Sequence, residues 1–88
     1  MKLTVSRLRN RHEHLATFMC SVSKNEIIVD WFKDEHELYP CDKYEFLEAD
    51  CLHGLIIHDL CMNDYGNYCV VIGRKRNMHG CHLTMEGL

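Results

Sequence analysis

The stretch Asp64-Tyr65-Gly66-Asn67-Tyr68 decides the fold of this chain. It joins a cluster of turn-forming residues, 62–66, to a run of mainly apolar residues, 67–72, that favours a β-strand. A second strand is predicted well before it, because residues 15–22 alternate apolar and polar side chains. A period of two is typical of a strand that buries one face.

Further segments of this kind recur about every ten residues, separated by turn clusters such as 50–54. They are 27–32, 44–47, 55–59 and 82–86. Short strands at this interval, without an amphipathic helix, favour an antiparallel β-sandwich or a small barrel. The chain has one proline and five glycines and no internal repeat, which predicts a single domain over residues 1–88.

Three features in this order resemble the immunoglobulin fold and its I-set subclass. Trp31 follows Cys20 by eleven residues, the spacing between the core cysteine of strand B and the tryptophan of strand C. The opening stretch matches the Asp-x-Gly-x-Tyr signature at the turn into strand F, and residues 55–60 resemble the strand E pattern Leu-x-Ile-x-x-Val/Leu. The resemblance implies an all-β, two-sheet antiparallel Greek-key sandwich, with strands A, B, E and D facing A′, G, F and C.

The subclass is indicated by the short distance between strands C and F. Trp31 and Val70 are 39 residues apart, which leaves no room for the extra strand pair of variable-type domains. The segment WFKDEHEL (residues 31–38) resembles the Trp-Phe-Lys-Asp-Gly-x-x-Leu segment of intracellular muscle modules, such as those of titin, obscurin, myomesin and myosin-binding protein C. Glu35 or His36 replaces the glycine, so we expect a different turn after strand C.

The resemblance also implies a set of structural core residues. They are Cys20, Trp31, Leu55, Ile57, Asp64, Gly66, Tyr68 and Val70. The large apolar residues Phe18, Val29, Leu83 and Met85 are expected in the same core.

In secreted relatives the strand B cysteine pairs with the residue two past the corner tyrosine, and that residue is Val70 here. Cys69 lies one position away, and an offset of one residue turns a side chain to the opposite face of the sheet. A bridge from Cys20 to Cys69 would therefore need a change of register, and we expect the six cysteines to be reduced. A disulfide framework, for example Cys51 with Cys69, stays open.

Composition excludes several classes of function. The net charge is −3, and eleven acids against two lysines fall within residues 26–64, so no nucleic-acid partner is expected. No apolar run is long enough to span a membrane. Seven histidines and six cysteines lack the paired spacing of a zinc site, and no catalytic triad or phosphate loop occurs. We expect no enzyme, no cofactor, no metal and no membrane partner.

Two basic clusters are the candidate partner-binding residues. Arg7 and Arg9 recur with a period of two, so an extended segment presents both on one side. The resemblance places Arg74, Lys75 and Arg76 in the F–G hairpin, at an end of the sandwich where family members bind partners. Solubility and protection of sheet edges is the alternative role for both clusters.

The resemblance implies a non-catalytic structural and interaction module of a larger cytoskeletal or sarcomeric protein in the cytoplasm. It would bear load through its terminal strands and bind a protein partner, another immunoglobulin domain among the candidates. Two alternatives stay open. An extracellular adhesion or receptor module shares the fold, although the sequence has no Asn-x-Ser/Thr sequon. A cysteine-based redox-responsive module predicts a thiol with a depressed pKa beside a basic group.

Overall fold

The computed structural model of the chain describes residues 2–9, 14–22, 28–73 and 77–83. These residues form eight strands, all paired in antiparallel fashion, and one short 3₁₀ turn. The strands are β1 (Lys2–Arg9), β2 (His14–Ser21), β3 (Val29–Lys33), β4 (His36–Glu37), β5 (Tyr44–Ala49), β6 (Leu52–Ile57), β7 (Gly66–Ile72) and β8 (Asn77–Leu83), and the turn is η1 (Met62–Asp64).

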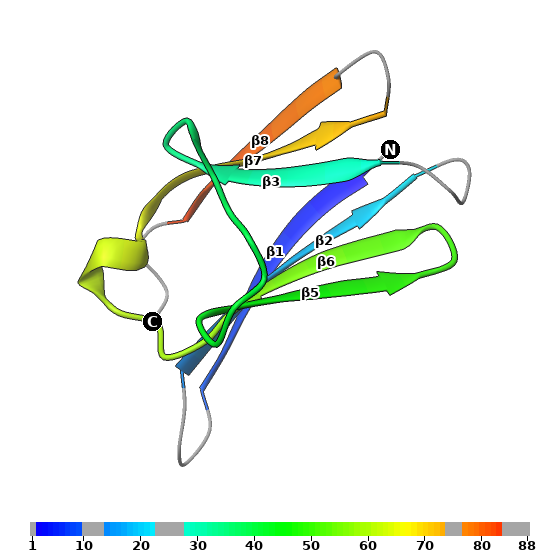
Figure 1. Cartoon of the computed structure of the whole chain (residues 1–88). Helices are drawn as coiled ribbons and strands as arrows, with labels where there is room; N and C mark the ends of the chain where they lie inside the picture. The colour runs from blue at the N-terminus through cyan, green and yellow to red at the C-terminus, as the bar shows by residue number, and fades with distance from the viewer. Residues whose placement is uncertain (1, 10–13, 23–27, 74–76, 84–88) are drawn as a thin grey trace.

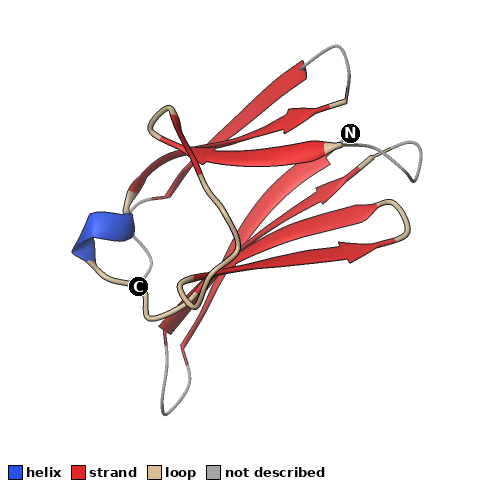
Figure 2. Ribbon diagram, in the orientation of Figure 1, coloured by secondary structure: helices blue, strands red, loops and turns tan. Residues whose placement is uncertain are grey.

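The strands make two facing layers (Figures 1 and 2). Sheet A has the order β1-β2-β6-β5 and sheet B has the order β4-β3-β7-β8. The chain crosses between the layers after β2, after β4 and after β6. The all-β, two-sheet antiparallel sandwich that the sequence predicted is confirmed.

The sequence predicted an A′ strand in the same sheet as the last strand, and the position of the first strand differs from that prediction. β1 pairs with β2 along its whole length, from Lys2 opposite Ser21 to Arg9 opposite His14, although it also lies close to β8. A strand that changes sheet needs a bulge or a bend, and β1 has neither proline nor glycine to supply one. Its described residues therefore stay in sheet A.

Two strand boundaries also differ from the sequence prediction. β6 begins at Leu52 because the reversal is completed at Asp50, which has a φ of 54°. Gly54 is thus a strand residue and not part of the turn. β8 begins at Asn77, well before the predicted start at 82, because its ladder follows β7 from Ile72 opposite Asn77 onwards. The expected strand residues 84–86 lie outside the described part of the chain.

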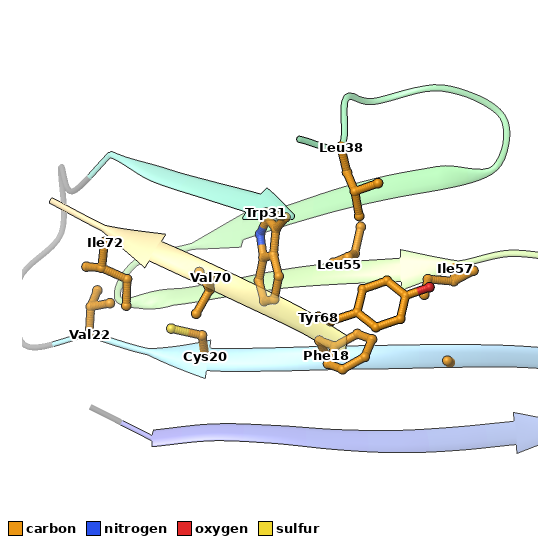
Figure 3. Packing of buried hydrophobic residues seen from close by; sticks show 11 residues of the cluster. Phe18, Cys20, Val22, Trp31, Leu38, Leu55, Ile57, Tyr68, Val70 and Ile72 are labelled. Carbon is orange, nitrogen blue, oxygen red and sulfur yellow. The ribbon is translucent and has the colours of Figure 1, made fainter. Parts of the chain in front are cut away.

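The core lies between the layers and is built from alternate residues of the central strands (Figure 3). Phe18 is at its centre, with ring centroids 6.2 Å from Trp31 and 4.8 Å from Tyr68. Burying each such side chain contributes about 1.5–3 kcal/mol to stability. The buried cluster is Ala16, Phe18, Cys20, Val22, Trp31, Leu38, Leu55, Ile57, Tyr68, Val70 and Ile72.

Of the other expected core residues, Val29 is partly buried against this cluster. Leu83 ends β8, and its side chain lies outside what the structure describes, as does all of Met85. Two polar side chains are buried among the described residues: Asp64 is 4 % exposed and His53 is 5 % exposed. His53 Nε2 has no hydrogen-bond partner among the described residues. An unpaired buried polar group costs about 1–3 kcal/mol, so His53 weakens the core that it helps to fill.

Candidate partner-binding surface on sheet B

The corner before β7 is tied down by hydrogen bonds. The Tyr68 hydroxyl donates to the backbone carbonyl of Asp64. The Asp64 carboxylate accepts bonds from the Cys61 backbone N–H at 2.9 Å and from the Lys43 ammonium at 2.7 Å. Burial alone would lower the pKa of Lys43, but the hydrogen bond to Asp64 and the charge of that carboxylate outweigh it and raise the pKa. The start of β7 is thereby fixed to the rest of the sandwich.

A second clamp joins the β3–β4 turn to the same strand. The turn residues Asp34 and Glu35 have φ angles of 47° and 73°, as in the two-residue turns that suit a twisted hairpin. The Asp34 N–H donates to the Asn67 carbonyl at 2.8 Å, and the Asn67 N–H donates to Asp34 Oδ1 at 3.0 Å. A Cβ on Gly66 would lie 2.8 Å from Asp34 Oδ2, so the clamp requires glycine there.

The outer face of sheet B carries two cross-strand rows of residues. Phe32 lies opposite Cys69, which lies opposite Gly80. In the next row Val71 lies opposite Met78. Val71 is only 4 % exposed although it points away from the core, whereas Met78 is 68 % exposed. The outer face of sheet B therefore carries an apolar patch among polar residues such as Asp30 and Asn67.

This face is hollowed where Gly80 contributes no side chain. A hollow of about 610 Å³ and a neighbouring one of about 390 Å³ share Glu35, Cys69 and Met78 in their linings, and we call the two together the sheet B trough. The first hollow is also lined by Asp34, Asn67, Tyr68 and Gly80, and the second by Phe32 and Val71. One end of the trough is thus polar, the other is mainly apolar, and Glu35 borders both.

Acidic residues surround the trough on the β3–β4 side. Glu37 lies opposite Phe32, and Asp30 lies opposite Val71. The charge of Glu37, followed by burial and by the charge of Asp30, raises the pKa of the Tyr39 phenol. Negative charge is therefore one cause of this shift, beside burial and a hydrogen bond with Glu37.

One cation stands close to the acidic end. Lys33 Nζ lies 3.1 Å from Asp34 Oδ2 and 6.0 Å from the centroid of the Tyr68 ring. Glu35 has no ion pair with any described residue. The acidic end of the trough therefore keeps at least one carboxylate that is not matched by a described cation.

None of the described residues that line this trough is one of the predicted basic residues. Arg7 and Arg9 lie in sheet A, at register positions opposite Ala16 and His14. Arg74, Lys75 and Arg76 lie outside the described residues. The trough itself was missed from the sequence. The signals that could have indicated it are the unbroken apolar run 68–72, which suggests a strand with two buried faces, and a glycine within β8.

The cysteines whose side chains the structure describes are Cys20, Cys41, Cys51, Cys61 and Cys69, and all five are free thiols. Cys20 is fully buried in the core, whereas Cys69 is on the outer face of sheet B. Cys51 precedes β6 in sheet A, so Cys51 and Cys69 belong to opposite layers. Burial raises the pKa of both Cys20 and Cys69, the opposite direction to the one that a redox-responsive thiol requires.

In the part of the chain that the structure describes, no three histidine, cysteine or acidic residues gather in a way that could hold a metal ion. No helix within those same residues has the length and apolar character needed to cross a membrane.

Two facing antiparallel sheets, a buried tryptophan in β3 and a tyrosine corner before β7 define an immunoglobulin-like β-sandwich. A sequence model described as the immunoglobulin I-set domain matches residues 1–86. The chain therefore belongs to the immunoglobulin I-set family. Immunoglobulin domains are generally non-catalytic and commonly mediate contacts between proteins.

Solved structures of muscle proteins are similar to this chain. Domain I10 of titin is 28 % identical with a TM-score of 0.73, and the match covers 80 % of this chain and 77 % of that one. The I9–I11 tandem of titin is 23 % identical with a TM-score of 0.75, and the match covers 91 % of this chain but only 32 % of the tandem. The kinase region of twitchin from C. elegans is 26 % identical with a TM-score of 0.66, covering 76 % and 12 % respectively. The resemblance to titin-like modules is confirmed.

Proposed function

We propose that this chain is one module in a linear array of such domains within a large cytoskeletal or sarcomeric protein of the cytoplasm, where it bears load and binds a protein partner without catalysis. The likeness to domains of titin and twitchin supports this context. In the I9–I11 tandem of titin, a domain similar to this chain stands among neighbours of its own kind.

The observation that carries the load-bearing role is the direction of the terminal strands. β1 and β8 run in the same direction, so the start of β1 and the end of β8 lie at opposite ends of the strands (Figure 1). Tension applied through neighbouring modules would pull β1 along the line of β2 and β8 along the line of β7. Inter-strand hydrogen bonds lie across that line, so the ladder would have to break as a group and not one bond at a time.

Single-molecule stretching of a tandem of this domain tests the role. Proline is placed singly at Thr4 and at Val5 in β1, because one of two successive amides in an antiparallel edge strand points at its neighbour. At one of the two positions the unfolding force is expected to fall clearly. The matched control is proline placed singly at Phe46 and at Leu47 in β5, the edge strand at the other side of sheet A, which is remote from both terminal strands.

This control separates a loss of unfolding force from a loss of thermodynamic stability. Denaturant unfolding of each variant gives its loss of free energy, and variants with equal losses are then compared for force. A force that falls alike for β1 and β5 variants would show that β1 has no special mechanical role.

The basic clusters remain the predicted partner-binding residues of this module. Charge reversal at Arg74, Lys75 and Arg76 should weaken capture of a partner from muscle lysate while the melting temperature stays nearly unchanged. Reversal at Arg7 and Arg9 tests the second cluster in the same way. Unchanged capture in either variant would remove that cluster from the binding surface.

A further inference from the structure

The sheet B trough has the composition of a docking surface and not of an ordinary exposed sheet face. A solvated antiparallel sheet normally carries polar side chains on its outer face. Here the outer positions of β3, β7 and β8 hold Phe32, Cys69, Val71 and Met78 beside Asp30 and Asn67, and Gly80 contributes no side chain. A Cβ added at Gly80 would meet only the Tyr68 carbonyl oxygen, at an ordinary 3.6 Å, so the fold does not need a glycine there.

The charge around the trough specifies what could fill it. Asp34 and Glu35 line its polar end, and Asp30 and Glu37 stand beside its apolar rows. Lys33 pairs with Asp34, and Glu35 has no ion pair with any described residue. A partner that buried an anion or a neutral polar group here would leave carboxylates without compensation, whereas a lysine or arginine would pair with them.

The spacing along β7 sets the pattern of the partner. The apolar end is at Val71 and the acidic end is at Asn67, which Asp34 clamps. Four residues of strand separate these two positions by about 13 Å, at roughly 3.3 Å per residue. An extended segment repeats each face every second residue, so an apolar side chain followed two to four residues later by a basic one would reach both ends.

We infer that the sheet B trough binds an extended segment of a partner protein that carries an apolar side chain and, two to four residues away, a lysine or arginine. The apolar side chain occupies the hollow between Phe32, Val71 and Met78, and the basic side chain passes over Gly80 in the neighbouring hollow and pairs with Glu35. This inference rests on the proposed function in that it names the class of partner, but it concerns the outer face of sheet B, whereas the stretching experiment tests the β1–β2 ladder of sheet A.

The probe for the test is a fluorescent heptapeptide with the sequence Leu-Thr-Leu-Thr-Arg-Thr-Arg. One control peptide replaces the arginines with glutamates, and the other replaces the leucines with threonines. Anisotropy titrations are expected to show binding of the first peptide only. Amide shifts in heteronuclear NMR spectra should be largest at Phe32, Cys69, Val71 and Met78.

Variants locate the site. Gly80→Val fills the space and should weaken binding at least about tenfold, and Glu35→Gln should weaken it about two- to fivefold, the range of an exposed ion pair. Glu48→Gln is the matched control, because Glu48 is an exposed acid on sheet A, and it should leave affinity unchanged. If Gly80→Val does not fold, Glu35→Gln still tests the pairing of the basic side chain with Glu35, because Glu35 is an exposed turn residue.

Thiol protection gives an independent readout. The peptide should slow alkylation of Cys69, which lines both hollows, while the exposed Cys41 serves as the reference within the same chain. Equal alkylation of Cys69 with and without peptide would overturn the proposed position of the ligand.

Other results overturn the inference outright. These are no binding by any peptide, equal binding to Gly80→Val, amide shifts confined to sheet A, or sedimentation showing that a second copy of the chain occupies the trough. None of them alters the stretching experiment. Loss of the mechanical role with retained peptide binding would reject load bearing alone.

Discussion

The outer faces of the two sheets each carry a glycine within a strand, and the two glycines differ in what covers them. On sheet A, a Cβ at Gly54 would lie 2.7 Å from Met19 Sδ and 3.4 Å from Leu47 Cβ, so neighbouring side chains already fill its place. On sheet B, a Cβ at Gly80 would meet only a backbone oxygen at 3.6 Å. One glycine is covered, and the other opens into the trough.

The difference follows from position in the sheet. β6 is a central strand, with Met19 of β2 opposite Gly54 on one side and Leu47 of β5 on the other. β8 pairs with β7 alone among the described strands, so Gly80 faces only the small Cys69. Whether a glycine leaves a hollow in the surface of a sheet therefore depends on the residues that the register places opposite it, and not on the glycine itself.

The largest expected effect comes from a substitution in the core that both sheets share. Phe18→Ala should lower the free energy of unfolding by about 3–5 kcal/mol, because Phe18 is fully buried between Trp31 and Tyr68. Denaturant unfolding measures the loss, and amide exchange should rise on both sheets together. Protection retained on sheet B alone would show that the two faces do not share one core.

A matched pair of valines tests the comparison directly. Gly54→Val should cost about 1–3 kcal/mol, because the new methyl groups compete with Met19 and Leu47 for filled space. Gly80→Val should stay within about 0.5 kcal/mol of the wild type, as expected at an open surface site. Met19→Ala in the Gly54→Val background should recover part of the loss. Equal costs for the two valines would mean that the glycines are not differently covered.

Alkaline pH should expose a second contrast between interior and outer face. Burial raises the folded-state pKa of Cys20 and Cys69 above the ordinary 9.0, and that of Tyr68 above the ordinary 10.0. The folded state then holds more protons than the unfolded state above these values. Stability is fully present below pH 9 and is lost as the pH rises, by about 1.4 kcal/mol per pH unit for each group that titrates only on unfolding.

Thiol variants assign this alkaline loss. Denaturant unfolding between pH 8 and pH 11 should show a flatter profile for Cys20→Ala, and a smaller flattening for Cys69→Ser, because Cys20 is the more deeply enclosed of the two. An identical profile for all three proteins would exclude the cysteines as the cause.

The smallest expected effect separates stability from binding at the turn. Glu35→Gly should raise the free energy of unfolding by about 0.5–1 kcal/mol, because a φ of 73° is unfavourable for glutamate and free for glycine. The same change should weaken the leucine–arginine peptide. Asp50→Gly, at a φ of 54° on sheet A, is the control that should gain stability without losing affinity. A loss of affinity in both variants would point to general electrostatics in place of the trough.

Local pattern was enough to predict most of the fold. The alternation around Phe18 and the apolar run after Tyr68 predicted strands that the structure contains as β2 and β7. The prediction was wrong at a glycine, because glycine occurs both in turns and within strands. Gly54 was predicted as part of a turn because glycine usually interrupts strands, whereas the chain reverses at Asp50 and Gly54 pairs with Met19 and Leu47 in the ladder.

The trough was not predictable in the same way. Its lining joins the β3–β4 turn with β7 and β8, segments that are brought together by cross-strand register and not by spacing along the chain. The basic clusters were predicted as binding residues because runs of charge can be recognised in the sequence. The hollow at Gly80 can be recognised only when the residues around that glycine in the folded chain are known.

The sequence by itself determined the class of this protein: its strands, its tryptophan in β3, its corner tyrosine and its family are all local patterns, which short-range physics and a few fixed spacings specify. Only the tertiary structure decided which face of which sheet is open, because that depends on residues far apart in the chain meeting in one register. Asp34 reaches Asn67, Met19 covers Gly54, and nothing larger than Cys69 stands opposite Gly80.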